Sequence, residues 1–406
     1  GGPANDSVAD GEVDSAGNIY LIGSTSSDLF ETNQGNRDIF VASYDAGGIL
    51  RWGIQFGDAG DDRGLGIAIG NGGLYIVGDT NNGNFGLALP DDDSLGGLDA
   101  FVARLNPVDG ATEWMRRFGT TQTDSARGVA VDSSGGVFVA GMTSGTLAGT
   151  GAQGDEDAFL ARFSDAESSD GSPGSRKWVN QFGLDATAED AAAVAVTDDF
   201  VYIAGKTGVV DSQGDAYVSR HSLSDGNRST QWRIGNEGVD YANSLAIDSG
   251  GDLYIAGRTE TDIDNDGINV QGPSDAFLAK IDPSTVEGVQ WVQVLASSAE
   301  DEAFGVAVDD FGNLYVTGEA NADLVGEINN YQGGGDVFTG RFTTDGDRNW
   351  LKFLGTSADE TGFKVFLGGR GTVFVTGATN GDLDNVENAG GSDGFLVRYT
   401  SAGVLE

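Results

Sequence analysis

Short hydrophobic runs, each followed by a Gly-rich or acidic turn, alternate with polar loops along the whole chain. Residues 124–183 show the pattern, with apolar or aromatic runs at 128–131, 137–140, 157–163 and 177–182. Runs of this length that are rich in β-branched and aromatic side chains are typical of strands. Because no stretch has sustained helical periodicity, the pattern predicts four strands in this segment and an all-β chain.

This four-strand unit is repeated seven times, and the clearest marker of each copy is the word Asp-x-[Phe/Tyr] at the start of the third strand. The marker recurs every 57 to 61 residues. The repeat acids are Asp38, Asp99, Asp157, Asp215, Asp275, Asp336 and Asp393. The approximate repeats are 1–57, 58–119, 120–183, 184–235, 236–295, 296–355 and 356–406. Copies of one unit bury their apolar faces against each other, so we treat residues 1–406 as one domain.

Seven units of four antiparallel strands predict a seven-bladed β-propeller. A linear solenoid is the alternative, although solenoids usually have shorter repeats and parallel strands. The first strand of each repeat is rich in Gly and Ala, so we place it beside the central axis. The fourth strand holds all six Trp residues of the chain, and we place it at the outside of each blade.

The two ends of the sequence fall inside a repeat. Residues 403–406 align with residues 48–51, so the sequence stops one residue before a seventh Trp, and Gly1 aligns just after Phe56. We therefore expect the outer strand of the last blade to be truncated. Two interpretations stay open: the boundaries of the given sequence remove the strand, or the edge is exposed in the protein and a neighbouring chain can add a strand to it. Since the sequence begins without Met or a signal peptide, we expect it to be a mature or excised part of a longer protein.

Three words of the repeat carry a family resemblance. Gly-Val-Ala-Val-Asp at 305–309, Gly-Asn-Leu-Tyr-Val-Thr-Gly at 312–318 and Asp-Ala-Phe-Leu-Ala-Lys at 275–280 resemble the bacterial SBBP propeller repeat. The resemblance covers essentially the whole chain. It implies a seven-bladed propeller in a secreted or surface-exposed protein, and the family has no common catalytic residue to transfer.

The charge of the chain narrows the choice of partners. The net charge is −41, from 63 acidic and 22 basic residues, which would repel nucleic acid and anionic membranes. Divalent cations or a basic protein surface suit this charge better, and an alternative is that the charge only keeps a Gly-rich sheet protein in solution. The absence of Cys excludes disulfides and thiolate sites, and no apolar run is long enough to span a membrane.

Acidic residues recur at two places in each repeat, before the first strand and at the start of the third. In a four-stranded blade both places lie on the same face, so we predict two concentric rings of carboxylates there. Two interpretations of these acids stay open: they fix turns by accepting backbone hydrogen bonds, or they bind divalent metal ions. The acids that precede the first strands are Asp6, Asp62, Asp124, Glu189, Asp240, Asp301 and the Asp359–Glu360 pair.

The best single candidate for a Ca²⁺ site is the loop that contains Asp262, Asp264 and Asp266 before Gly267. Alternating carboxylates before a Gly turn can direct oxygen atoms at Ca²⁺. The match to an EF-hand loop is incomplete, because Pro273 stands where the bidentate Glu would be. An acidic surface loop without metal is the alternative.

Catalysis has little support in the sequence. The only His is His221, at a position that is apolar in other repeats, and we expect it to pack at the end of a strand. Six third strands carry a basic residue, for which we expect pairing with carboxylates. A carboxylate-pair glycosidase stays open, but no acid pair is unique to one blade.

These observations favour a non-catalytic module, extracellular or at the cell surface, that serves binding, adhesion or assembly. Its partner would be another protein or a further copy of the chain, held at the acidic loop face or at the exposed blade edge, and Ca²⁺ would be its only cofactor. One alternative is a propeller that binds or acts on polysaccharide through its carboxylates. Another is a structural spacer in a larger surface protein.

Overall fold

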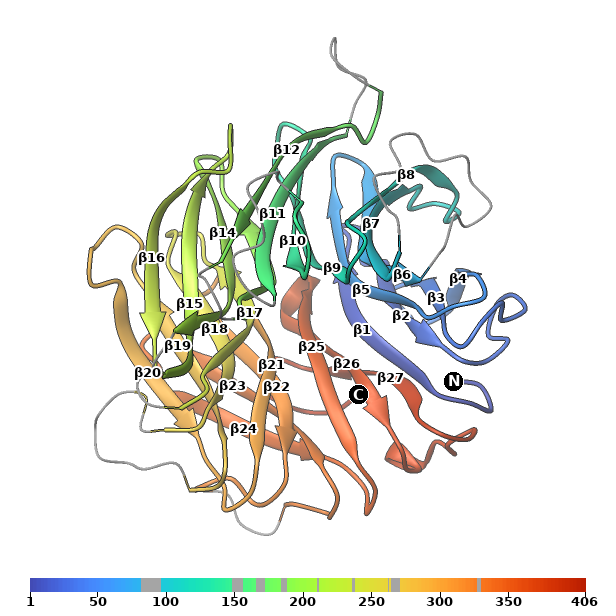
Figure 1. The fold of residues 1–406 in the computed structure, drawn as a ribbon. Helices are drawn as coiled ribbons and strands as arrows, with labels where there is room; N and C mark the ends of the chain where they lie inside the picture. Colours follow the sequence, from blue (N-terminus) through green and yellow to red (C-terminus); the bar gives the residue numbers. More distant parts are fainter. Residues whose placement is uncertain are drawn as a thin grey trace.

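The computed structural model describes residues 1–81, 96–147, 156–165, 172–183, 188–209, 212–235, 238–261, 263, 271–326 and 330–406. These residues form seven antiparallel sheets arranged around a common axis (Figure 1). The predicted seven-bladed propeller is therefore confirmed. The helical elements of the described residues are two three-residue 3₁₀ turns, η1 (Gly369–Gly371) and η2 (Leu383–Asn385), and neither is of a length or character to cross a membrane.

The first strand of each blade lies next to the axis. Each inner strand contacts the inner strand of the next blade, and the last inner strand contacts the first, so the ring is closed. The inner strands are β1 (Asp6–Val13), β5 (Asp62–Gly70), β9 (Asp124–Val131), β13 (Asp190–Val196), β17 (Tyr241–Ile247), β21 (Asp301–Val308) and β25 (Glu360–Gly368).

The second and third strands form the buried middle of each blade. Their apolar side chains pack between neighbouring blades, as Ile22 and Val41 of the first blade do against Ile67 and Ile76 of the second. The second strands are β2 (Ile19–Thr25), β6 (Gly73–Asn81), β10 (Gly136–Thr143), β14 (Phe200–Val209), β18 (Leu253–Thr259), β22 (Asn313–Ala320) and β26 (Thr372–Thr379). The third strands are β3 (Asp38–Tyr44), β7 (Leu98–Leu105), β11 (Asp157–Ser164), β15 (Ser212–Ser222), β19 (Asp275–Ile281), β23 (Asp336–Thr343) and β27 (Asp393–Tyr399).

Six blades have a fourth, outer strand, and the seventh blade has three strands, β25–β26–β27. The expected truncation is thus confirmed, and the N-terminus and the C-terminus both lie beside this blade (Figure 1). The outer strands are β4 (Leu50–Phe56), β8 (Thr112–Phe118), β12 (Arg176–Phe182), β16 (Arg228–Ile234), β20 (Val289–Leu295) and β24 (Arg348–Leu354).

Every inner strand contains a β-bulge that the sequence pattern did not predict. In β1 the pairing with β2 shifts between Val8 and Asp10, which leaves Ala9 as the extra residue. The same shift recurs in the six other blades. A bulge bends its strand and redirects a side chain, and here the extra residue of every blade lines the central channel.

Candidate functional site

The repeat acids lie at one end of the blades, in the same row as the acids that precede the inner strands. Asp6 and Asp38 are both paired with Thr25, one on each side of it. Side chains of both sets are buried, apart from the half-buried Asp215 and the exposed Asp359, so most of them lie beneath the loop face. This burial suits the structural role in fixing turns that the sequence left open beside metal binding.

Several repeat acids accept a backbone N–H from the residue four positions earlier. The amide of Gln34 donates to Asp38 Oδ2 at 3.0 Å and the amide of Ala389 donates to Asp393 Oδ2 at 2.6 Å. The amide of Gln271 donates to Asp275 Oδ2 at 2.8 Å. These hydrogen bonds hold the loop before each third strand in a turn.

The two sets of acids approach each other where neighbouring blades meet. Burial raises the pKa of Asp301 to about 7, and the charge of Asp275 on the preceding blade adds to the effect. Burial likewise raises the pKa of Asp62 to about 6, with smaller contributions from Asp58 and Asp38. These carboxyls are therefore harder to ionise than ordinary Asp side chains.

The residues predicted to bind Ca²⁺, Asp262, Asp264 and Asp266, lie outside the described residues. In the part of the chain that the structure describes, no group of three or more His, Asp or Glu side chains could together hold a metal ion. Ca²⁺ binding at Asp262, Asp264 and Asp266 thus stays a prediction.

A channel of about 810 Å³ runs along the axis and is lined by the inner strands. The bulge residues form one ring in it, and their side chains differ from blade to blade. They are Ala9, Leu65, Arg127, Ala192, Asn243, Phe304 and Phe363. Sequence reasoning missed this ring, because the search for a repeated word passes over a position that varies between repeats.

Two ion pairs, one within a blade and one between blades, occupy one side of the channel. Arg63 donates to both carboxylate oxygens of Asp79, at 2.8 and 2.6 Å, and Ser125 of the next blade donates to the same carboxylate at 2.6 Å. Arg127 donates to Asp190 Oδ2 at 2.6 Å. Both cations are already neutralised by carboxylates, so they leave little net positive charge for a ligand, and Arg127 also links its blade to the next.

Further along the channel, Lys364 lies 3.2 Å from Asp10 and faces Glu12. Burial opposes the charge of Lys364, but the two carboxylates outweigh it and raise the pKa of the ammonium group. Burial and the charge of Asp10 raise the pKa of Glu12 to about 7, with Lys364 acting in the opposite direction. Lys364, Asp10 and Glu12 therefore interact electrostatically, and the charge of Glu12 changes as the pH passes through about 7.

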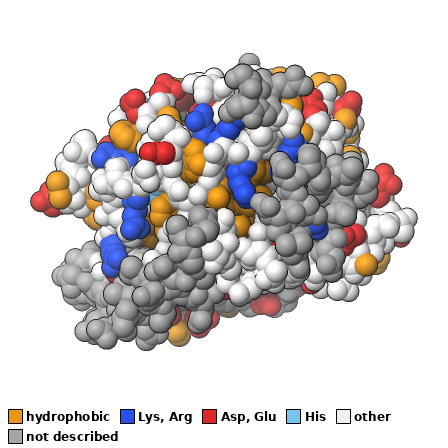
Figure 2. Space-filling model, turned by 45° about the horizontal axis from the view of Figure 1, so that its top comes forward, with side chains coloured by type: hydrophobic (Ala, Val, Ile, Leu, Met, Phe, Trp, Pro, Cys, Tyr) orange, Lys and Arg blue, Asp and Glu red, His pale blue; other side chains and the backbone are white. Residues whose placement is uncertain are grey.

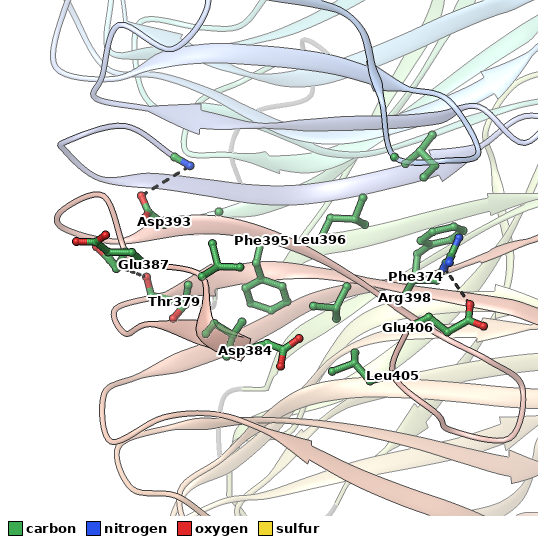
Figure 3. A pocket seen from close by; sticks show the side chains of 18 of the residues that line it. Phe374, Thr379, Asp384, Glu387, Asp393, Phe395, Leu396, Arg398, Leu405 and Glu406 are labelled. Carbon is green, nitrogen blue, oxygen red and sulfur yellow. Dashed lines mark hydrogen bonds and ion pairs between the residues drawn. The ribbon is translucent and has the colours of Figure 1, made fainter.

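A second hollow is a groove of about 560 Å³ beside β27. It lies where the six complete blades have their outer strand, and Figure 3 shows Phe395, Leu396 and Leu405 along it. Gly1 lies 3.9 Å from Asp393 at one end, and Arg398 pairs with Glu406 at 3.0 Å at the other (Figure 3).

The groove leaves apolar side chains uncovered that are sealed in other blades. Leu396 and Val397 are half-buried, whereas the matching residues of the first blade, Val41 and Ala42, are 0% and 1% exposed. Val386, in the loop above the groove, is 71% exposed. The edge therefore combines unpaired strand backbone with apolar surface, which is the usual form of a site for strand addition.

His221 is part of the core. Its side chain is fully buried, and its two ring nitrogens lie 2.8 Å from Ser219 Oγ and 3.0 Å from the carbonyl oxygen of Gly226. Burial lowers the pKa of His221 to about 4. This side chain is thus neutral at ordinary pH and closed to substrates.

Comparison with known proteins agrees with the fold. The family model of the SBBP beta-propeller repeat matches residues 113–147 and 290–324. The regulatory protein FlaEY of Caulobacter vibrioides is 25% identical over 382 residues, which are 90% of this chain and 35% of that protein. The WD40 domain of Neurospora crassa Pan2 has a TM-score of 0.52 at 9% identity, over 92% of this chain and 86% of that one.

These likenesses differ in what they show. At 9% identity the Pan2 domain shows the fold alone. The chain spans about a third of the length of FlaEY, so what the whole of that protein does is not transferred here. The chain is therefore a seven-bladed propeller, and two of its segments, residues 113–147 and 290–324, match the SBBP repeat.

Proposed function

We propose that this propeller is a non-catalytic module that binds protein partners, and that the open edge of the seventh blade is its principal binding surface. The observation that carries the proposal is the groove of about 560 Å³ beside β27. It offers unpaired backbone and half-buried apolar side chains at the same place, and an extended peptide would satisfy both.

Two further observations support a binding role. The relative from Caulobacter vibrioides is described as a regulatory protein, and regulation commonly works through protein contacts. The visible acidic side chains lie mostly toward the rim of the face in Figure 2, while Lys and Arg side chains lie among hydrophobic ones nearer its middle. With a net charge of −41, the rim favours partners with basic segments.

The residues that could carry acid–base chemistry support a non-catalytic role. His221 is sealed in the core and neutral, and Arg63 and Arg127 in the channel are held in ion pairs with Asp79 and Asp190. A general acid or base must reach its substrate, which His221 cannot do. The carboxylates of the loop face serve as acceptors for backbone amides.

The test is a binding experiment with the purified protein. Immobilised protein is exposed to extract of its source organism, bound proteins are identified, and each is then purified and titrated against the free protein. The proposal expects at least one saturable complex that Val386→Asp, in the groove, weakens. A protein that stays monomeric, binds no purified candidate and is active on glycans in an array and a reducing-sugar assay would contradict it and favour the polysaccharide alternative.

A further inference from the structure

The acids at the blade junctions need hydrogen-bond donors, because a buried carboxylate without a partner is costly. Where neighbouring blades meet, the repeat acid of one blade approaches the acid of the next inner strand. In the first and third blades, the outer strand places a Gln beside the repeat acid. Gln55 donates to Asp38 Oδ2 at 3.1 Å, and Gln181 donates to Asp157 Oδ2 at 2.6 Å.

In the second and fourth blades, an Arg of the outer strand takes the same place. Arg117 lies 3.9 Å from Asp99, and Arg233 lies 3.9 Å from Asp215. The outer strand of each of the first four blades thus gives the repeat acid either a neutral donor or a positive charge.

In the fifth blade this place is apolar. Val294 is paired with Phe277 there, as Gln55 is paired with Phe40 in the first blade. Asp275 Oδ2 still accepts a backbone amide, but Asp275 Oδ1 accepts no hydrogen bond from the described residues.

The facing acid, Asp301 of the sixth blade, has also lost a side-chain donor. In the seventh blade, Thr379 of the second strand is paired with Glu360 and donates to its Oε1 at 2.9 Å. Ala320 occupies the position of this Thr in the sixth blade, opposite Asp301. Asp301 Oδ1 accepts the hydroxyl of Ser297 at 2.9 Å, whereas Asp301 Oδ2 accepts no hydrogen bond from the described residues.

The next junction shows what this double loss means. Phe353 of the sixth outer strand is likewise apolar, but the facing Glu360 accepts the hydroxyls of Thr356 and Thr379, both at 2.9 Å. At the junction of the fifth and sixth blades, by contrast, the donors of both acids have been replaced by apolar side chains.

The two carboxyls that lost these donors are buried and close together. Asp275 is 0% exposed and Asp301 is 1% exposed. Burial raises the pKa of Asp275, whereas hydrogen bonds from backbone amides and from the Asp301 carboxyl lower it, so the two carboxyls lie within hydrogen-bond reach. Two ionised carboxylates at this separation repel each other unless a proton or a cation lies between them. Among the described residues, hydrogen-bond donors rather than Lys or Arg lower these two pKa values.

The chemistry of the facing atoms indicates which cation fits. They are carboxylate oxygens with the Ser297 hydroxyl beside them, and such oxygens are ligands for hard cations such as Ca²⁺ and Mg²⁺. A cation in so buried a site must give up most of its water. Mg²⁺ loses water reluctantly and demands near-octahedral geometry, whereas Ca²⁺ accepts irregular sets of oxygens. The site therefore suits Ca²⁺ better.

We propose that the junction of the fifth and sixth blades binds Ca²⁺ between Asp275 Oδ1 and Asp301 Oδ2. Two carboxylates are fewer ligands than Ca²⁺ usually takes, so Ser297 Oγ and water would complete its coordination. The bound ion would link β19 to β21 and hold two neighbouring blades together. This inference goes beyond the proposed function and does not depend on it, because the edge of the seventh blade has no part in it.

The test is a calorimetric titration of the intact, metal-free protein with CaCl₂ alone, in about 0.15 M salt to screen the general acidic charge. We expect saturable binding. Asp275→Asn should weaken it at least about tenfold, because the change removes a ligand. Asp99→Asn is the matched control and should leave the affinity unchanged, because Asp99 is equally buried, at 1% exposed, and Arg117 already supplies a positive charge beside it.

A second variant tests the site without removing an acid. Val294→Gln restores the donor that Gln55 supplies in the first blade, so it should weaken Ca²⁺ binding while leaving the melting temperature of the metal-free protein unchanged or higher. A variant that merely failed to fold would lower that temperature, so the two effects are separable.

A third variant separates this site from the acidic loop that precedes β19. Replacing Asp262, Asp264 and Asp266 by Asn should leave the binding that Asp275→Asn removes. The inference is overturned if CaCl₂ gives no saturable binding, or if Asp275→Asn and Asp99→Asn bind Ca²⁺ equally well. It is also overturned if the loop variant abolishes binding that Asp275→Asn retains. None of these results bears on whether the protein binds a partner.

Discussion

At the scale of single residues, buried charge shapes this protein more than its surface charge does. The acids at the start of the strands are sealed under the loop face, where they accept backbone amides. Their burial makes ionisation costly, and the cost is a property of the folded state alone. Their pKa values thus link stability to pH.

Asp301→Asn should flatten the pH dependence of stability. The folded pKa of Asp301 is about 7, above its ordinary value of 3.8, so its contribution to stability is complete below about pH 4 and is lost as the pH rises through 7. We expect the variant to lose about 2 kcal/mol less stability than the unmodified protein between pH 5 and pH 8. Urea unfolding at the two pH values measures this loss of stability. An equal loss in the variant and in the unmodified protein would contradict the prediction.

Lys364→Met should destabilise the protein, and more so at alkaline pH. The change leaves the carboxylates of Asp10 and Glu12 without their cation. Breaking a fully buried pair typically costs about 3–5 kcal/mol, and because the Lys364 side chain is 32% exposed we expect a loss below that range. Because the pKa of Glu12 is about 7, Glu12 is largely protonated at pH 5 and the loss should be smaller there. Thermal melts at pH 5 and pH 8 test this, and an equal loss at both values would refute the coupling.

Six third strands were predicted to pair their basic residue with a carboxylate, and the structure shows this for four of them. Arg104, Arg162, Lys280 and Arg398 lie within 2.8 to 3.5 Å of an acid. Arg220 and Arg341 instead donate to hydroxyl, amide and carbonyl oxygens. The sequence shows which side chains recur, but the acids they meet lie on loops that differ between repeats.

At the scale of strands and turns, the repeat predicted the elements well because each copy is locally the same. The aromatic second strand and the Asp-x-aromatic third strand lie where the pattern placed them. The bulges escaped prediction because the extra residue, such as Arg127 or Phe304, has no fixed type. The three-stranded last blade followed from aligning the ends of the sequence with the repeat.

Trp232→Ala tests the outer Trp as a link between blades. Trp232 is 3% exposed and packs on Gly288 of the next blade. Removing so large a buried ring should cost about 3–5 kcal/mol of stability. Chemical denaturation measures the loss. A cost below about 1 kcal/mol would show that the outer strands contribute little to the contact between blades.

At the scale of the whole molecule, closure of the ring distributes stability among the blades. The junction of the seventh and first blades is made by inner strands and by an apolar cluster, in which Phe366 and Phe374 of the seventh blade pack with residues of the first such as Leu21, without an outer strand. This junction is therefore the place where the ring should open first.

Addition of Ca²⁺ tests the predicted cation site formed by Asp262, Asp264 and Asp266. If these residues bind Ca²⁺ in the folded state, millimolar Ca²⁺ should raise the melting temperature, because a ligand that binds only the native form stabilises it. Mg²⁺ at equal concentration controls for general screening of the −41 charge. An unchanged melting temperature, or equal shifts with both ions, would rule out a specific Ca²⁺ site at these residues.

The most direct test of the open edge is hydrogen exchange of β27 in the free protein and in a complex with a purified partner. The carbonyl of Arg398 faces the edge, and alternate residues of a strand direct their backbone to the same side, so the amides of Leu396 and Gly394 face it as well. We predict fast exchange of these two amides in the free protein and strong protection when the partner is bound. Slow exchange in the free protein, or protection that falls on other strands, would contradict the account.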